Sequence, residues 1–398
     1  MKLIGRSQDK YFSNYRYIFF LFLCCGLFYY MLKSNYLNDR SGDFQVVQKT
    51  RINWIDIAKA ICIFLIAYGH TVRGNSPLMN SFSFHTACFF LLSGMTCNTD
   101  FLKARIRKDF KTIMVPYYCF GILSILIYSF LGKFASAALS TDVNMSIAKN
   151  IWDLLYALPG AERLKFNMPL WFLPCLFATK ITYYALDKLC RGKTLYVFIC
   201  SIVLCGLGFL YTRLIGFGLP FNLAISAKML VFFVVGRIFY LYIIAQEIAH
   251  KDRYLLLGIA FLCTNAILAF YAPRISYAGD LFPNIPAFLL TAFLGSFGVC
   301  FLSISIGKCK PMEHVGRHTL AVLTMHKFPI LFFQTIGPFA IWLTKYSTLM
   351  GVVSSILVAF ISVIMCLLVE PIVTRFFPFL FGDFYHFTIC KRRSSNIS

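Results

Sequence analysis

Apolar runs of about 20 residues recur along this chain, and a run of that length crosses the hydrocarbon core of a bilayer as one helix. In lipid the backbone must satisfy its own hydrogen bonds, so repeated apolar runs indicate membrane helices. Of the 398 residues, 59% are hydrophobic and 14% are charged, and the mean hydropathy is +0.71. Soluble domains carry about a quarter charged residues. The sequence therefore predicts an all-α fold, a polytopic transmembrane helix bundle.

About ten core helices are predicted, together with one N-terminal apolar helix. That first helix, at 17–32, lies within an N-terminal extension, 1–50, and reads as an uncleaved helix because no small-residue cleavage site follows it. The membrane domain is predicted over 51–372 and a basic tail over 373–398. The core spans are expected at about 54–72, 82–99, 113–132, 169–187, 194–211, 221–244, 254–272, 286–306, 319–342 and 349–369.

The distribution of positive charge predicts how these spans are oriented. The net charge is +22, and Lys and Arg are concentrated in alternate loops, for example 103–111 and 188–193. Cytoplasmic loops carry such an excess. Both ends of the core are therefore expected in the cytoplasm, in a multi-pass protein of the cell (inner or plasma) membrane whose partners include membrane lipids. The helix at 17–32 either breaks this rule or lies in the membrane interface.

Two other classes of partner are not expected. No water-facing basic stretch is interleaved with aromatic residues, which argues against a nucleic-acid partner. Most of the 15 cysteines lie inside apolar runs, where free cysteine behaves as a small hydrophobic residue. The chain has no C-x-x-C motif, no H-E-x-x-H motif and no paired ligand cluster. We therefore predict neither a metal site nor a structural disulfide.

Lys59 and His70 share one face of the first core span. They are eleven residues apart, which places them within about 20° of each other around the helix and about 16 Å apart along it. An ionisable side chain inside the membrane is costly and by default suggests function. Plainer interpretations stay open, because Lys59 could extend to the interface or pair with Asp56, and His70 could be a satisfied polar residue at a helix end.

Further polar residues are expected at the two ends of this first span. His85 opens the second span at the level of His70, and neutral imidazole near its ordinary pKa can accept a proton from an alcohol. At the opposite level, Arg105 and Arg107 lie in a basic loop just inside the membrane. An Arg pair suits phosphate through its bidentate donors, although such charges also simply fix topology.

Six short motifs follow one another between residues 51 and 370. Lys59 and His70 form an Arg/Lys-x10-His pattern, and FHTACFFLLSG fits F-H-x-P-x-F-F-x-x-S-G with Ala87 in place of the proline. Arg105 and Arg107 form R-x-R, with a Pro-Tyr pair downstream. The remaining motifs are PLWFLPCLF (169–177), LPFNLAISAKMLVFFVVGRIF (219–239) and VGRHTLAVLTMH (315–326). In this order they resemble the acyltransferase-3 family of membrane enzymes, which includes fucose 4-O-acetylase-like enzymes and O-antigen acetyltransferases.

The resemblance implies a membrane O-acetyltransferase. Its donor substrate would be acetyl-CoA, with no tightly bound cofactor, and its acceptor a sugar hydroxyl of a cell-surface or exported polysaccharide, either a glycan or a lipid-linked sugar. His70 would be the general base and His85 would orient it or the substrate. Direct attack and an acyl-histidine intermediate both stay open.

The resemblance also suggests where the donor and the oxyanion would be held. The donor phosphates would dock at Arg105 and Arg107, with Lys59 near the same path. Acyl transfer from a thioester needs a stabilised oxyanion, and Ser93, His326 and Arg317 are candidate donors for it.

Two other classes of function also fit a bundle with polar groups inside it. One is a transporter or exporter of a glycan or small solute. The absence of recognisable inverted repeats weighs against it. The other is a non-catalytic membrane partner of a glycan assembly system.

Overall fold

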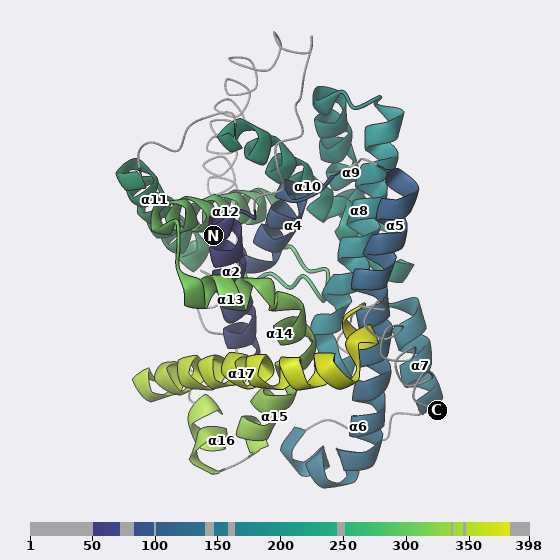
Figure 1. Cartoon of the computed structure of the whole chain (residues 1–398), viewed down its shortest axis with the longest axis vertical. Coiled ribbons are helices and arrows are strands. Elements are labelled where there is room, and N and C mark those ends of the chain that lie inside the picture. Colours follow the sequence, from purple (N-terminus) through teal and green to yellow (C-terminus); the bar gives the residue numbers. More distant parts are fainter. Residues whose placement is uncertain are drawn as a thin grey trace, which may run out of the picture.

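The computed structural model describes residues 51–71, 83–98, 101–139, 147–157, 164–244, 251–335, 337–344 and 348–382. Within these ranges the elements are helices, apart from one isolated β-bridge between Ser276 and Leu281. Seven of the described helical segments are long and apolar enough to cross a membrane. The prediction of an all-α, polytopic helix bundle is therefore confirmed (Figure 1). The predicted helix at 17–32 lies outside the described residues.

The described helices follow one another along the chain in two groups. The first half of the bundle contains α2 (Asn53–Thr71), α4 (His85–Met95), α5 (Leu102–Asp109), η1 (Phe110–Met114), α6 (Val115–Leu139), α7 (Ile147–Tyr156), η2 (Lys165–Trp171), α8 (Phe172–Leu189) and α9 (Thr194–Leu214). The second half contains η3 (Pro220–Asn222), α10 (Leu223–Ile244), α11 (Lys251–Tyr271), α12 (Ile285–Ile306), α13 (Lys310–Arg317), α14 (Thr319–Met325), α15 (Lys327–Thr335), α16 (Gly337–Thr344), α17 (Leu349–Phe376) and η4 (Pro378–Phe381).

Some predicted spans are shorter or interrupted. The span expected at 82–99 is the eleven-residue helix α4. The span expected at 319–342 is divided among α14, α15 and α16. Pro329 explains the first break, because a proline ring clashes with the carbonyl four residues earlier, at Met325, where α14 ends. α17 continues to Phe376, beyond the predicted domain limit at 372.

The basic segment after α4 is a helix, so its prediction as a loop is wrong. α5 runs over LKARIRKD and is rich in good helix formers. It continues without a gap through the π-helical turn η1 into α6, and Figure 1 shows the three as one long rod. The wider π turn immediately precedes Pro116, and such turns accommodate a break in the ordinary hydrogen-bond ladder.

Small residues bring the central helices into backbone contact. A Cβ added at Gly94 of α4 would meet the carbonyl of Phe233 in α10, and one added at Gly236 of α10 would meet the carbonyl of Leu91 in α4. Gly316 of α13 lies in the same way against the Asp56 carbonyl of α2. Such close crossings are typical of membrane bundles. They join α10 to α4, and α13 to α2, the helix that carries the candidate site.

Candidate active site

The C-terminal end of α2 holds two imidazoles in contact, and we call it the imidazole end. The ring centroids of His70 and His326 lie 5.3 Å apart, with the ring planes tilted by 40°. His70 ends α2, whereas His326 occupies the turn between α14 and α15. His85, which opens α4, and Lys327 both lie near enough to interact electrostatically with His70. The fold thus brings together three histidines that the sequence singled out.

His326 has one nitrogen bonded and one without a partner. Its Nδ1 lies 2.7 Å from the Val322 carbonyl oxygen, which can only accept, so Nδ1 carries the proton. Nε2 then holds the lone pair of the neutral ring. It makes no hydrogen bond to the described residues, and the side chain is fully buried. Nε2 of His326 is therefore a buried hydrogen-bond acceptor whose lone pair is available.

Polar contacts from two helices hold the end of α2 in place. Gln334 of α15 donates its Nε2 to the carbonyls of His70 and Thr71, at 3.2 and 3.4 Å. Thr71 donates its hydroxyl to the carbonyl of Ser355 in α17, at 3.3 Å. The last carbonyls of a helix have no partner within the helix. These contacts therefore satisfy the end of α2 and fix the backbone of His70.

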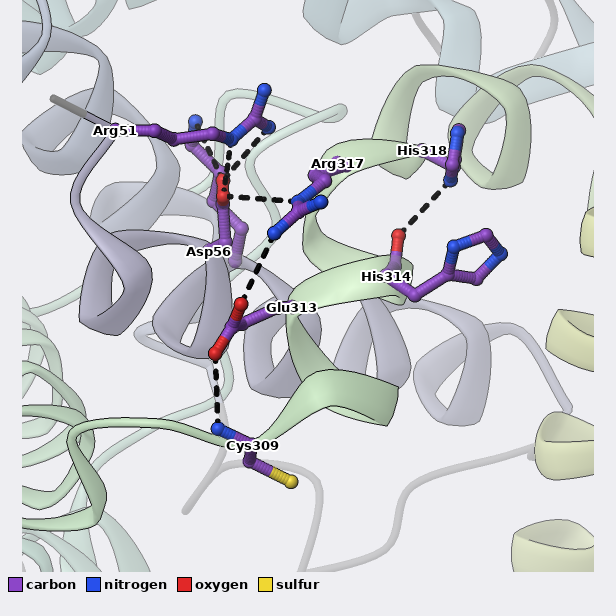
Figure 2. A network of polar contacts seen from close by, with 8 residues as sticks. Arg51, Asp56, Cys309, Glu313, His314, Arg317 and His318 are labelled. Carbon is purple, nitrogen blue, oxygen red and sulfur yellow. Dashed lines mark hydrogen bonds and ion pairs between the residues drawn. The ribbon is translucent and has the colours of Figure 1, made fainter. Parts of the chain in front are cut away.

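The N-terminal end of α2 is organised around a buried carboxylate, and we call it the ion-pair end (Figure 2). Asp56 accepts two hydrogen bonds from Arg51, at 2.6 and 3.2 Å. The predicted partner Lys59 is present at 3.9 Å, and Arg317 approaches from α13 at 3.8 Å. Three cations thus share the Asp56 carboxylate at this end.

α13 adds a second carboxylate to the ion-pair end. Glu313 lies 3.1 Å from Arg317 and also accepts a hydrogen bond from the backbone N–H of Cys309, which caps the start of α13. His318 follows α13 and lies 4.0 Å from Glu370 of α17. Burial lowers the pKa of His318, while the Glu370 carboxylate opposes that change.

A basic cavity of about 770 Å³ lies between α5–η1 and η4. Lys103, Arg107 and Lys111 recur every fourth residue and so project from one face of the helix. The cavity is lined by Lys103, Ala104, Arg107, Lys108, Lys111, Thr112, Phe381 and Gly382. Four cations in one open cavity form a site suited to a multiply charged anion.

A buried ion pair fixes the rotation of this basic helix. Asp109, the last residue of α5, accepts hydrogen bonds from Lys180 at 2.5 Å and from the Tyr184 hydroxyl at 2.6 Å, both from α8. With Asp109 turned toward α8, Arg107 is exposed and faces the cavity. Arg105 is two positions away, on a different face of the helix, and does not line the cavity.

α17 passes both ends of α2 and then leads into the wall of the basic cavity. Ser355, early in α17, contacts Thr71 at the imidazole end. Glu370, fifteen residues later, lies beside His318 at the ion-pair end. The chain then passes through η4, where Phe381 forms part of the cavity wall. The basic cavity therefore lies toward the ion-pair end, and the imidazoles lie at the other end.

The remaining candidates are not at the imidazole end. Arg317 contacts Asp56, fourteen residues before His70 and so about 21 Å away along α2. Ser93 lies eight residues after His85, about 12 Å further along α4. The contributors missed from sequence include Lys327, Gln334, Phe381 and Gly382, which no local pattern marks as site residues.

The described residues contain no group of three or more His, Cys, Asp or Glu side chains that could hold a metal ion.

In comparisons with known proteins, one family model matches residues 52–371 and is described as an acyltransferase domain. No curated protein and no solved structure matches the chain significantly.

Proposed function

Because the chain belongs to the acyltransferase-3 family of membrane acyltransferases, we propose that it transfers an acetyl group from acetyl-CoA to a sugar hydroxyl. The acceptor is a cell-surface or exported polysaccharide, or its lipid-linked precursor. The observation that carries this proposal is the separation of two unlike sites along α2. A basic cavity lies toward the ion-pair end, and an imidazole pair lies at the other end.

The donor end suits the phosphates of CoA. Arg107, Lys103 and Lys111 supply fixed positive charge on one helix face, and hydrogen bonds between arginine and phosphate are among the stronger ones in proteins. Lys59 is partly exposed, and its amino group lies 3.9 Å from Asp56, the longest of the three contacts between Asp56 and a cation. It is therefore placed to meet a polar group of the donor as it passes toward the imidazoles.

The acceptor end suits activation of a hydroxyl. His70 accepts the proton of the sugar hydroxyl, and the oxygen attacks the carbonyl carbon of the thioester. The C–S bond then breaks, the proton passes to the CoA sulfur, and the products are the acetyl ester and free CoA. Lys327 is a cation near His70 and supports the oxyanion that forms during attack.

The charge distribution supports an orientation for this reaction. The basic cavity and the ion-pair end are assigned to the cytoplasm, where CoA is available, and the imidazole end faces outward in the cell membrane. Both ends of the core are then cytoplasmic. This orientation delivers acetyl groups to glycans that are completed outside the cytoplasm.

The test uses the purified full chain in lipid vesicles with acetyl-CoA and candidate glycans. Wild-type protein is expected to release free CoA only when the glycan is present, and the glycan is expected to gain acetyl mass. His70→Ala should abolish both signals, whereas His314→Ala, which removes an exposed histidine at the other end, should not. Glycan-dependent CoA release by His70→Ala at the wild-type rate would rule out the assigned base.

A further inference from the structure

We propose that His326 positions His70: its Nε2 lone pair takes the N–H of His70, selects the reactive tautomer and shares the proton when His70 becomes charged. This inference rests on the proposed function, since it gives the base of that reaction a partner. It stands on the contact between two rings that are 256 positions apart in the sequence.

One hydrogen bond fixes the tautomer of His326. Its Nδ1–H is committed to the Val322 carbonyl at 2.7 Å. The neutral ring therefore has no N–H left for an oxyanion, and His326 acts as an acceptor. A backbone carbonyl that receives Nδ1–H also fixes the orientation of the ring and makes the other nitrogen more basic.

The other nitrogen of His326, Nε2, lacks a hydrogen-bond donor among the described residues. A buried acceptor without a hydrogen bond is costly, and most buried polar atoms in proteins are satisfied. His326 is fully buried, and its Nε2 has no hydrogen bond within the described part of the chain. The imidazole of His70, with its centroid 5.3 Å away and its plane tilted by 40°, carries one N–H when neutral. A centroid separation of 5.3 Å leaves the two ring edges within hydrogen-bonding reach when the N–H of His70 turns toward Nε2.

A hydrogen bond from His70 to His326 sets which nitrogen of His70 acts as the base. Once one nitrogen of His70 donates to His326, its other nitrogen holds the lone pair and can take the proton of the acceptor hydroxyl. When His70 becomes the imidazolium, its N–H toward His326 becomes a charge-assisted hydrogen bond, which is stronger than a neutral one. The same arrangement, with a carboxylate in place of the second imidazole, holds the base of a Ser-His-Asp triad.

Among the described residues, the side chains that interact electrostatically with His70 are Lys327, His326 and His85, and none of them is a carboxylate. The carboxylate of Asp56 lies at the other end of α2, where it is engaged by cations. His326 is therefore a buried acceptor in ring contact with His70.

The test compares His326→Leu, which keeps volume but removes the lone pair, with His326→Gln, which keeps an acceptor near the Nε2 position. Met325→Leu is the matched control, since it changes the neighbouring buried residue without changing polarity. His326→Leu should lower kcat by about 100-fold, the size of a general-base contribution, with the KM for acetyl-CoA unchanged. His326→Gln should retain much of the activity.

A second measurement does not depend on acyl transfer. Diethyl pyrocarbonate acylates a neutral, nucleophilic imidazole, and mass spectrometry reports its rate at His70. That rate should fall by about fivefold in His326→Leu, the worth of one net hydrogen bond, and should stay near wild type in His326→Gln. An equal rate in wild type and His326→Leu overturns the inference. If the wild type transfers no acetyl group but His70 reactivity depends on His326, the pair stands and the proposed function fails.

Discussion

Breaking the buried Lys228–Asp280 ion pair from its two sides should have unequal effects on stability. Lys228 in α10 is fully buried, and its amino group lies 2.5 Å from Asp280 and 2.7 Å from the Thr212 hydroxyl. The rings of Phe209 and Phe282 lie 5.0 and 5.2 Å from the same nitrogen. The Asp280 side chain keeps 23% of its surface exposed. The cation is thus much harder to rehydrate than the carboxylate.

The expected losses of stability follow from the different exposure of Lys228 and Asp280. Asp280→Asn leaves a buried cation without its counter-ion, a change that typically costs about 3–5 kcal/mol. The aromatic faces and Thr212 still stabilise the cation, so we expect the lower value, about 3 kcal/mol. Lys228→Met removes the buried charge, and Asp280 keeps its hydrogen bond from Thr212 and its access to water. That variant should lose only about 1 kcal/mol, and the double variant should resemble it.

The assay is thermal unfolding of the detergent-solubilised chain, followed by the monodisperse fraction on size-exclusion chromatography. Asparagine tolerates the left-handed backbone at position 280, where φ is 50°, so Asp280→Asn tests charge and not backbone strain. We expect Asp280→Asn to have the lowest Tm, with Lys228→Met and the double variant close to wild type. The reasoning is refuted if Lys228→Met is the less stable single variant, or if Asp280→Asn unfolds together with wild type.

Two further predictions concern the cavity and the bundle. Arg107→Ala should raise the KM for acetyl-CoA by about 10-fold, because it removes about one charge-assisted hydrogen bond to the donor. Arg105→Ala should change that KM much less, because Arg105 does not line the cavity. Equal effects of the two variants in steady-state kinetics would contradict this. Gly236→Ala should lower the free energy of unfolding by about 1–3 kcal/mol, because its Cβ meets a backbone carbonyl of α4. Gly206→Ala, where the added Cβ meets nothing within 4 Å, is the control and should unfold like wild type.

The helices of the bundle could be predicted from sequence where hydropathy alone decides them. The expected span 54–72 corresponds to α2 at Asn53–Thr71, and the expected span 286–306 to α12 at Ile285–Ile306. Hydropathy does not report interruptions within an apolar run. The break between α14 and α15 depends on proline geometry, and α5 depends on helix propensity in a segment too polar to be recognised as a span.

The candidate site was predictable in its local contacts and not in its distant ones. The pairing of Lys59 with Asp56 follows from their spacing within one helix and is present at 3.9 Å. Arg317 joins the same carboxylate from α13, and nothing in either local sequence indicates that contact. The sequence marked His326 as a motif histidine and a candidate oxyanion donor, not as a partner of His70. The tautomer of His326 and its ring contact with His70 depend on how α14 is placed against α2.

Several buried ion pairs support the packing of the bundle, and the buried imidazole pair is available for chemistry. Polar groups inside a membrane are costly, and a bundle keeps them by pairing them. Asp56 is surrounded by three cations, and Asp109 is held by Lys180 from α8. Lys228 has its carboxylate in the same way. These pairs fix α13, α5 and α10 relative to their neighbours. His326 differs, because its Nε2 is buried beside a second imidazole with its lone pair unused within the described residues. The paired charges hold the helices together, whereas the His326 acceptor is left for the N–H of His70.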